Sequence, residues 1–475
     1  MLRLLKSMAR SMYATIARFP VTVMVSLTLG ILLVYGNHHR NLPDLYTRIN
    51  MTLGLAIPLT ALATLAAGRF SQASRRKLFP WVLVAFQLAA GLLLFAYWLY
   101  MTPIGEDTGV YRNLRGFKLM GLVSVAALGF FAAQHFPRRK GFVMHVIRIL
   151  IRILVTAIFT GVLCGGLDAI IFAADQLFDL NISNRIYTDV VFLVITVFTP
   201  LYFFGGVPLL SGKEDAGEED TGKAGTEDYP GFLKVLFLYI VLPLLSVYMI
   251  IVLLYCLRVL LAGQPWPENR LLTLAFPVAP ILTASLFLIA PLARIYRWPR
   301  IAISVLPIAV LPLFAMMFAG LAIRTQAYGM TEQRYFVWVM GGWTALVMIG
   351  MIYQRVKKTS GNGFQGVLLP VTLAVAVFFM VLGPVNAYRI SQNSQNERLS
   401  RLFGSYGLLR EGEIDREKLE ARPAFSTEDR MEIQEILEYF RMKYSLSRVK
   451  VLNSFTEKDE IYALLGFDKP YPNMP

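Results

Sequence analysis

The feature that most constrains this chain is a series of long apolar runs separated by short polar segments. A bilayer core of about 30 Å is crossed by roughly 20 apolar residues in a helix. Eleven runs approach this length: 19–36, 51–67, 80–100, 117–136, 153–172, 186–204, 232–256, 271–293, 303–323, 335–353 and 367–385. Backbone groups in hydrocarbon must be paired within their own segment, so each run is predicted to be a helix.

The predicted fold is therefore all-α: a polytopic transmembrane helical bundle of about eleven helices with a small C-terminal helical soluble domain. Only 16% of the residues are charged, against about 25% in soluble domains. We expect an N-terminal four-helix membrane region (1–140), a seven-helix membrane core (141–385) and the soluble domain (386–475). Within the core, residues 211–230 are Gly-rich and acidic, which predicts a disordered loop.

The basic residues predict the orientation. The N-terminus and every second loop hold 22 Lys and Arg, against 10 in the alternate loops. Cytoplasmic loops carry the excess of basic residues, so the N-terminus is predicted to be cytoplasmic and the C-terminus extracytoplasmic. The net charge of +15 is distributed between apolar runs, and this favours the lipid bilayer, not nucleic acid, as the partner of the basic groups.

Few residue patterns suggest catalysis. The two cysteines, Cys164 and Cys256, lie inside apolar runs, and the four histidines have no carboxylate or histidine at metal-ligand spacing on a helix. We therefore expect no cofactor, no metal and no catalytic residue. An intramembrane enzyme is disfavoured because no pairing of a nucleophile with a base is visible.

The fifth run carries the first candidate site. Gly161, Gly165, Asp168, Phe172 and Asp175 are spaced by 4, 3, 4 and 3 residues and share one helix face. The two glycines would allow another helix to approach closely. A carboxylate inside the membrane is costly unless paired or hydrated, so Asp168 is a candidate for binding a substrate or ion. The alternative is that Asp168 only bonds a neighbouring helix.

The second candidate is the connection 324–335. Gly329 can take a left-handed conformation that ends one helix, and Thr331 can cap the next, with Glu332 favourable in its first turn. This accounts for the segment as a tight helical hairpin. Alternatively, Arg324, Glu332 and Arg334 form a polar cluster that binds a substrate or ion at the outer mouth. Prolines inside the later runs, such as Pro277 and Pro307, are a weak sign of the broken helices of transporters.

Several motifs resemble one family. They are Ala174–Phe178 (ADQLF), Tyr239–Tyr255, Trp266-Pro267, Tyr328–Tyr335 (YGMTEQRY), and Asn386 with Ser391, Gln392, Gln395 and Arg398–Leu402. On these the chain resembles a bacterial multi-pass membrane family, domain of unknown function 4153, over roughly residues 143–409. The resemblance implies a bacterial cytoplasmic membrane location and no activity.

Two classes of function remain open. The first is a non-catalytic envelope component that handles or transports a solute or lipid, through an outer cluster of Asp168, Asp175, Trp266, Glu268 and the charged residues of 324–335. The second is a membrane sensor or assembly scaffold. In that case an envelope protein is the expected partner, bound through residues 386–475.

Overall fold

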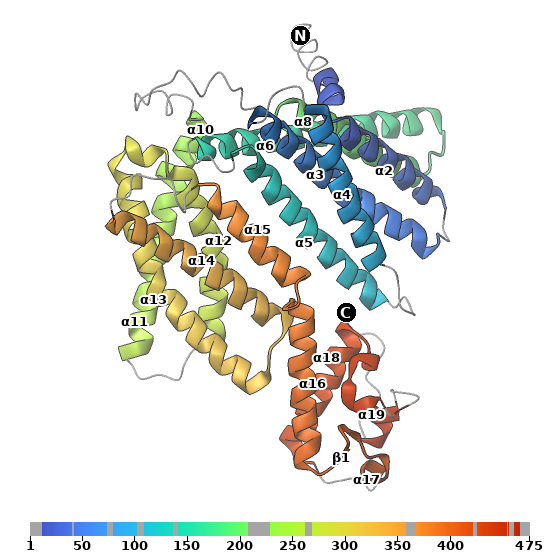
Figure 1. The fold of residues 1–475 in the computed structure, drawn as a ribbon, viewed down its shortest axis with the longest axis vertical. Coiled ribbons are helices and arrows are strands. Elements are labelled where there is room, and N and C mark those ends of the chain that lie inside the picture. The colour runs from blue at the N-terminus through green and yellow to red at the C-terminus, as the bar shows by residue number, and fades with distance from the viewer. Residues whose placement is uncertain are drawn as a thin grey trace.

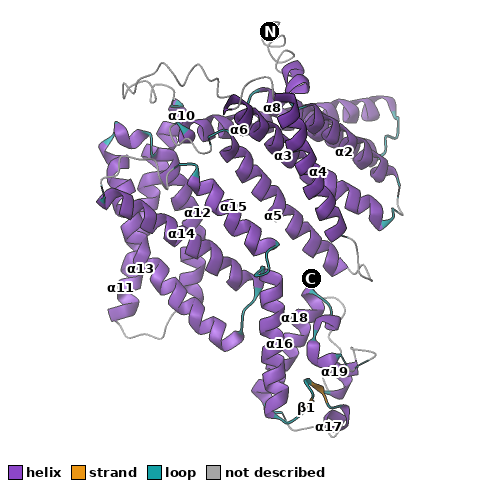
Figure 2. Ribbon diagram, in the orientation of Figure 1, coloured by secondary structure: helices purple, strands orange, loops and turns teal. Residues whose placement is uncertain are grey.

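The chain is almost entirely helical, as the predicted fold class requires (Figure 2). The computed structural model describes residues 12–39, 42–73, 79–101, 109–135, 141–207, 229–261, 268–357, 366–420, 425–453, 455 and 460–465. Within these ranges, nine helices are long and apolar enough to cross a membrane, and two shorter apolar helices are Phe276–Ile289 and Leu368–Val381. These eleven segments coincide with the eleven predicted runs. Most of the predicted loop 211–230 falls outside the described residues.

The N-terminal half of the bundle consists of the membrane helices up to residue 205 (Figure 1). They are α2 (Pro20–His38), α3 (Asp44–Ala73), α4 (Phe79–Tyr100), α5 (Gly109–Ala133), α6 (Phe142–Phe178), and α7 (Asn184–Leu193), which continues through η2 (Val194–Phe198) into α8 (Thr199–Gly205). α3 packs between α2 on one side and α4 and α5 on the other.

The second half of the bundle begins at residue 231. Its elements are α10 (Gly231–Val235), η3 (Leu236–Val241), α11 (Leu242–Leu261), α12 (Glu268–Ile289), η4 (Leu292–Arg294), α13 (Arg297–Tyr328), α14 (Glu332–Val356) and α15 (Leu368–Val381). α15 lies along α5 and joins the two halves (Figure 1).

Helix α6 is longer than its apolar run predicted. Its 37 residues span about 55 Å, whereas the hydrocarbon core is about 30 Å thick. The helix begins at Phe142 and continues through Arg152, which precedes the predicted run 153–172. The Arg152 guanidinium lies 3.9 Å from the ring centroid of Tyr202 and donates to the Tyr202 carbonyl, so its charge is engaged by α8.

Two membrane helices contain π-helical turns directly before a proline. η2 precedes Pro200, and η3 precedes Pro243. A proline has no N–H to donate, and its ring clashes with the carbonyl four residues earlier in an α-helix. The wider π-turn accommodates the ring, so both helices run on through the proline.

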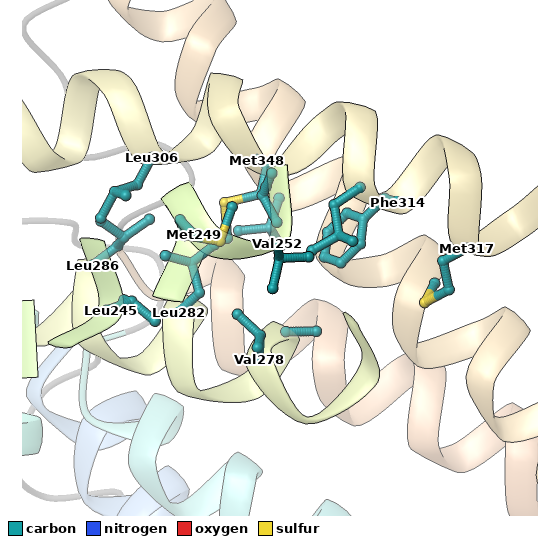
Figure 3. Close-up of a cluster of buried hydrophobic side chains, with 14 of the residues drawn as sticks. Leu245, Met249, Val252, Val278, Leu282, Leu286, Leu306, Phe314, Met317 and Met348 are labelled. Carbon is teal, nitrogen blue, oxygen red and sulfur yellow. The ribbon is translucent and has the colours of Figure 1, made fainter. Parts of the chain in front are cut away.

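The largest apolar core lies in the second half, among α11, α12, α13 and α14 (Figure 3). Met249, Leu282, Val310 and Met348 are fully or almost fully buried there. The opposite faces of these helices are exposed; for example, Ile281, next to Leu282, is 53% exposed. One face therefore packs against protein and the other is apolar and uncovered, as a bilayer requires.

The C-terminal unit, residues 387–465, has its own core. Its elements are α16 (Ala387–Ser405), β1 (Leu409–Arg410), β2 (Glu413–Ile414), α17 (Arg416–Glu420), α18 (Thr427–Lys443), η5 (Leu446–Arg448), η6 (Lys450–Leu452) and α19 (Glu460–Leu464). Phe403, Ile433, Leu437 and Phe440 form the centre of its core. Ser426 caps α18, since its Oγ accepts from the amide of Asp429 at 3.0 Å.

A short β-hairpin in this unit contradicts the expectation that the chain has no strands. Leu409 pairs with Ile414, and Arg410 with Glu413. The two turn residues, Glu411 and Gly412, have φ of 54° and 86°, and two consecutive positive φ values define the turn that joins two-residue hairpins. The strands are too short for alternation to show in the sequence.

The C-terminal unit lies at the end of the bundle away from the N-terminus, next to the turn between α13 and α14 (Figure 1). α16 follows α15 closely, and Asn386 caps it by accepting from the Arg389 amide at 3.0 Å. The motif residues 328–335 and 386–402 are thus brought together, although residues 336–385 separate them in the chain.

Candidate functional site at the junction of the hairpin and the C-terminal unit

The turn between α13 and α14 depends on one glycine. Gly329 has φ of 67° and ψ of 179°, which confirms the predicted positive φ. The ψ value, however, places it in a region that is essentially restricted to glycine instead of the left-handed helical region. A Cβ at this position would lie 2.7 Å from Cδ of Arg398 and 3.0 Å from Nε2 of Gln395. Gly329 is therefore required by the backbone and by close packing of α16.

Thr331 occupies the predicted N-cap position of α14, but its side chain makes no capping hydrogen bond. The prediction that this hydroxyl caps the helix is wrong. A neighbouring backbone donor in the turn finds its partner outside the hairpin, because the Met330 amide donates to Oγ of Ser394 on α16 at 2.8 Å. The backbone of the turn is thus bonded by a residue of α16, whereas the sequence predicted a bond from Thr331 within the hairpin.

The carbonyl of Tyr328 is the centre of the contact with α16. It accepts from Nη1 of Arg334 at 3.1 Å, Nε2 of Gln395 at 3.2 Å and Nη1 of Arg398 at 2.7 Å. Arg398 also forms an ion pair with Glu432 on α18, with 2.6 Å between Nη2 and Oε1. The exposed carbonyls at the end of a helix need partners, and here α16 supplies them.

Glu332 connects the same turn to α18. Its side chain is buried, and its carboxylate accepts from the Tyr439 hydroxyl at 2.7 Å, from Nζ of Lys443 at 3.1 Å and from the Tyr444 hydroxyl. A buried carboxylate is stable only when it is paired and hydrogen-bonded, and all three of these donors belong to the C-terminal unit. Burial, reinforced by the nearby Glu332 charge, raises the pKa of Tyr439; burial likewise raises the pKa of Tyr444.

These contacts hold the C-terminal unit against the end of the bundle at two points. Residues of the turn face α16 through backbone groups, and Glu332 faces α18 through its side chain. The charged groups of the hairpin are thereby largely engaged within the protein, which favours the interpretation of 324–335 as a structural hairpin. The structure also shows that the C-terminal unit packs against this hairpin.

The residues predicted on the fifth run lie on α6. Asp175 accepts from the Ile182 amide at 2.7 Å and thereby stabilises the turn after α6, where Asp179 and Asn181 have positive φ. Asp168 is half-buried, and its Oδ1 has no hydrogen-bond partner. Among the described residues outside the local helix backbone, no atom lies within 4 Å of a Cβ placed at Gly161 or Gly165, so no described helix uses the close approach that they allow.

The structure therefore divides the predicted outer cluster. Glu332 and Arg334 meet residues of α16 and α18, and Arg324 lies one turn before Tyr328 on α13. In the described part of the chain, no hydrogen bond or ion pair joins Asp168 to the hairpin, and the carboxylate of Asp175 bonds its own loop. Trp266 and the side chain of Glu268 fall outside what the structure describes.

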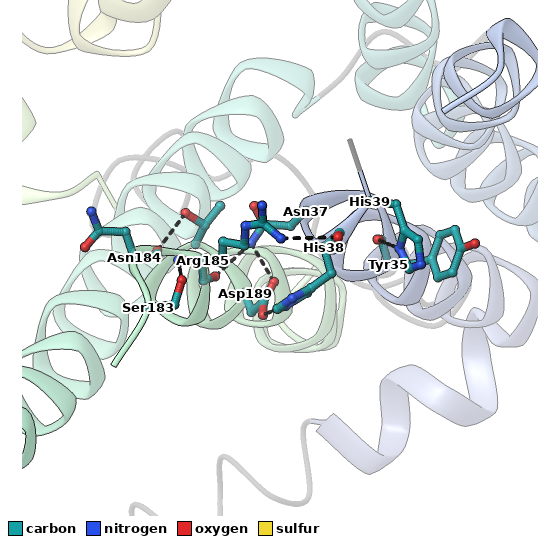
Figure 4. A network of polar contacts seen from close by, with 9 residues as sticks. Tyr35, Asn37, His38, His39, Ser183, Asn184, Arg185 and Asp189 are labelled. Carbon is teal, nitrogen blue, oxygen red and sulfur yellow. Dashed lines mark hydrogen bonds and ion pairs between the residues drawn. The ribbon is translucent and has the colours of Figure 1, made fainter. Parts of the chain in front are cut away.

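Sequence reasoning missed the partners of Glu332. The hydroxyls of Tyr439 and Tyr444 reach across to the hairpin, a role that no pattern in the sequence indicated. It also missed a polar contact between α2 and α7 (Figure 4), where Asp189 accepts from Asn37 at 2.8 Å and pairs with His38 at 2.7 Å. The polar residues at the end of α2 and in α7 could have indicated such a contact, but which of them pair depends on the fold.

A metal centre finds no support in the described residues, among which no three His, Cys, Asp or Glu side chains are grouped to hold an ion. His135 and His145 are both buried, with ring centroids 4.5 Å apart. The turn after α5 and the start of α6 pack these two rings against each other.

In the part of the chain that the structure describes, nine membrane-length helices, two shorter apolar ones and a polar C-terminal unit define a multi-pass membrane protein. Residues 21–405 match the family model of the Domain of unknown function (DUF4153), and the chain belongs to this family. The match begins within α2, so it extends beyond the resemblance over 143–409 and includes the first four helices. Comparison with curated proteins and with solved structures gave no match.

Proposed function

We propose that this protein is a membrane scaffold or sensor of the bacterial envelope that presents its C-terminal unit, at a fixed position, to an envelope protein. The observation that carries the proposal is the buried Glu332 carboxylate, which takes all three of its donors from α18 and its C-terminal end. The C-terminal unit corresponds to the extracytoplasmic domain proposed for residues 386–475, on a chain that lies in the cytoplasmic membrane with its N-terminus inside.

The contact supports this function because it removes the freedom of the connection after α15. If the C-terminal unit were connected to the bundle through α15 alone, the carboxylate of Glu332 on α14 would not be buried against it. Leaving such a group unpaired costs about 1–3 kcal/mol, so the contact is retained only if the two parts stay together. A change in the arrangement of α13 and α14 would then be transmitted to α18, as a sensor requires.

The proposed partner surface is a groove on the C-terminal unit. It has a volume of about 600 Å³ and is lined by Asn396, Glu397, Ser400, Arg401 and Lys450. Asn396 is buried and fixes the floor, because it donates to the Arg448 carbonyl at 3.1 Å and accepts from the Lys450 amide at 2.8 Å. The charged residues at the rim leave the groove suited to a polar segment of a protein.

A second candidate function is the handling of a solute or lipid along α6. The observation that favours it is Oδ1 of Asp168, which lies without a hydrogen-bond partner in a membrane-length helix. An ionisable side chain inside a membrane helix is costly and is therefore a candidate for a functional site.

One experiment separates the two functions. A deletion strain, characterised by growth and envelope lipid composition, is complemented with Asp168→Asn and with Glu332→Ala, and the abundance of each variant is measured. The scaffold function predicts full complementation by Asp168→Asn and loss by Glu332→Ala at normal abundance. The opposite pattern would reject the scaffold and support solute or lipid handling. Arg401→Ala, at the rim of the groove, should resemble Glu332→Ala.

A further inference from the structure

The guanidinium of Arg334 is held in place from one side only. Its Nη1 donates to the carbonyls of Tyr328 and Gly329, at 3.1 and 2.5 Å, and the group lies 5.7 Å from the centroid of the Tyr328 ring. Nε and Nη2 make no hydrogen bond in the structure and are not among the buried polar atoms. Arg334 therefore presents an oriented and accessible edge with two donors.

Positive charge accumulates around this edge. Arg398 donates to the same Tyr328 carbonyl as Arg334, and Arg324 lies four residues before Tyr328 on α13, which places it on the same face of that helix. Both are like-charged neighbours of Arg334. Among the described residues, the carboxylates of Glu332 and Glu432 form ion pairs with Lys443 and Arg398 and not with Arg334.

The position of this cluster indicates what kind of anion it meets. Tyr328 ends one candidate membrane span and Glu332 begins the next, so the turn between them lies where the hydrocarbon gives way to headgroups. Tyrosine and arginine are typical of this depth, and Tyr328 is 49% exposed beside the cluster. The anions concentrated at this depth are lipid phosphates.

We propose that the open edge of Arg334, with Arg324 as a second charge, binds a phosphate group at the membrane surface. A guanidinium edge matches two oxygens of a phosphate and forms two parallel, charge-assisted hydrogen bonds with it. The phosphate belongs either to the headgroup of an anionic phospholipid or to a soluble phosphate-bearing solute. This site is independent of the contact between Glu332 and α18.

The test uses the full-length protein in nanodiscs of phosphatidylcholine, with and without phosphatidylglycerol, and native mass spectrometry to count retained lipids. The wild-type protein should retain phosphatidylglycerol in preference to phosphatidylcholine. Arg334→Gln should reduce this preference about tenfold, since two charge-assisted bonds are lost. Arg324→Gln leaves both carbonyl contacts of Arg334 in place and should reduce the preference less.

The matched control is Arg258→Gln. Arg258 is an exposed arginine in the last turn of α11, at the same end of the bundle, and its replacement should leave the preference unchanged. Equal lipid preference in the wild-type protein and in the Arg324 and Arg334 variants would overturn the proposal. A preference reduced as much by Arg258→Gln would also overturn it, as general charge attraction. If Arg334→Gln does not fold, Arg324→Gln and Arg334→Lys decide the outcome.

A second measurement distinguishes the source of the phosphate. Inorganic phosphate is titrated onto the protein in phosphatidylcholine nanodiscs, and thermal unfolding is followed. Stabilisation by phosphate that is lost in Arg334→Gln, without lipid preference, identifies a soluble ligand at the proposed site. If neither phosphate nor phosphatidylglycerol has an effect that depends on Arg334, the site does not exist.

Discussion

At the scale of single residues, the contact between the hairpin and the C-terminal unit depends on two residues in environments that are unusual for their type. Glu332 is an acid that is buried, and Gly329 is a flexible residue held in one conformation. Each is stabilised by residues far away in the sequence. Substitutions at these positions should therefore have large effects, although neither residue belongs to the apolar core.

Gly329→Val is expected to lower the stability of the folded protein. A β-branched residue resists positive φ, at a cost of about 1–3 kcal/mol, and its Cβ would meet Arg398. The measurement is thermal unfolding in detergent together with abundance in the membrane. Gly342→Ala is the control, since nothing lies within 4 Å of a Cβ there and the residue is within α14. Unchanged stability of Gly329→Val would show that the turn has another conformation.

Alkaline pH is expected to release the C-terminal unit. Burial raises the pKa of Tyr439 and Tyr444 above the ordinary value of 10.0, so the folded state holds these protons more tightly than the unfolded state does. The resulting stability is fully present below pH 10 and is lost as the pH rises above it. Proteolysis of α18, followed from pH 8 to 11, should show this release, whereas α12 should stay protected. A release that occurs on acidification alone contradicts the assignment.

At the scale of elements, the two faces of each membrane helix meet different environments. Leu282 on α12 is fully buried, whereas Ile281 beside it is 53% exposed. Membrane helices are held together by close packing because lipid is as apolar as leucine. The stability of the bundle should thus depend on the buried face only.

Leu282→Ala should destabilise the protein by about 2–5 kcal/mol, the usual cost of a cavity at a buried leucine. Ile281→Ala, the matched control on the same helix, should cost less than about 1 kcal/mol, because the removed atoms face outward. Thermal unfolding of both variants in the same detergent provides the comparison. Equal losses would mean that the face of α12 with Ile281 also packs against protein, as in an oligomer.

At the scale of the whole molecule, the two ends of the bundle differ in what they carry. The C-terminal unit sits at the end away from the N-terminus (Figure 1). The distribution of Lys and Arg predicts that this end is extracytoplasmic. A phosphatase reporter that is active only outside the cytoplasm should be active when fused after residue 475. The same reporter inserted within 211–230 should be silent, and the reverse pattern would overturn the orientation.

The sequence by itself determined the class of the fold and the location of its helices. Eleven apolar runs were sufficient, because hydrocarbon forces each backbone segment to satisfy its own hydrogen bonds, so that each membrane helix is a local consequence of composition. The positive φ of Gly329 was equally local. The length of α6 was not, because Arg152 is accommodated by the ring and the carbonyl of Tyr202 on another helix.

Only the tertiary structure decided how the polar residues are used. Thr331 is at a cap position without capping, because α16 provides a partner for the neighbouring backbone. Glu332 and Tyr439 are 107 residues apart, and no periodicity in the sequence records which donor a buried carboxylate finds. Pairing between distant polar groups depends on how helices meet, and that depends on packing over the whole chain. The position of the hairpin could therefore be predicted from the sequence, whereas its contact with the C-terminal unit depends on the fold.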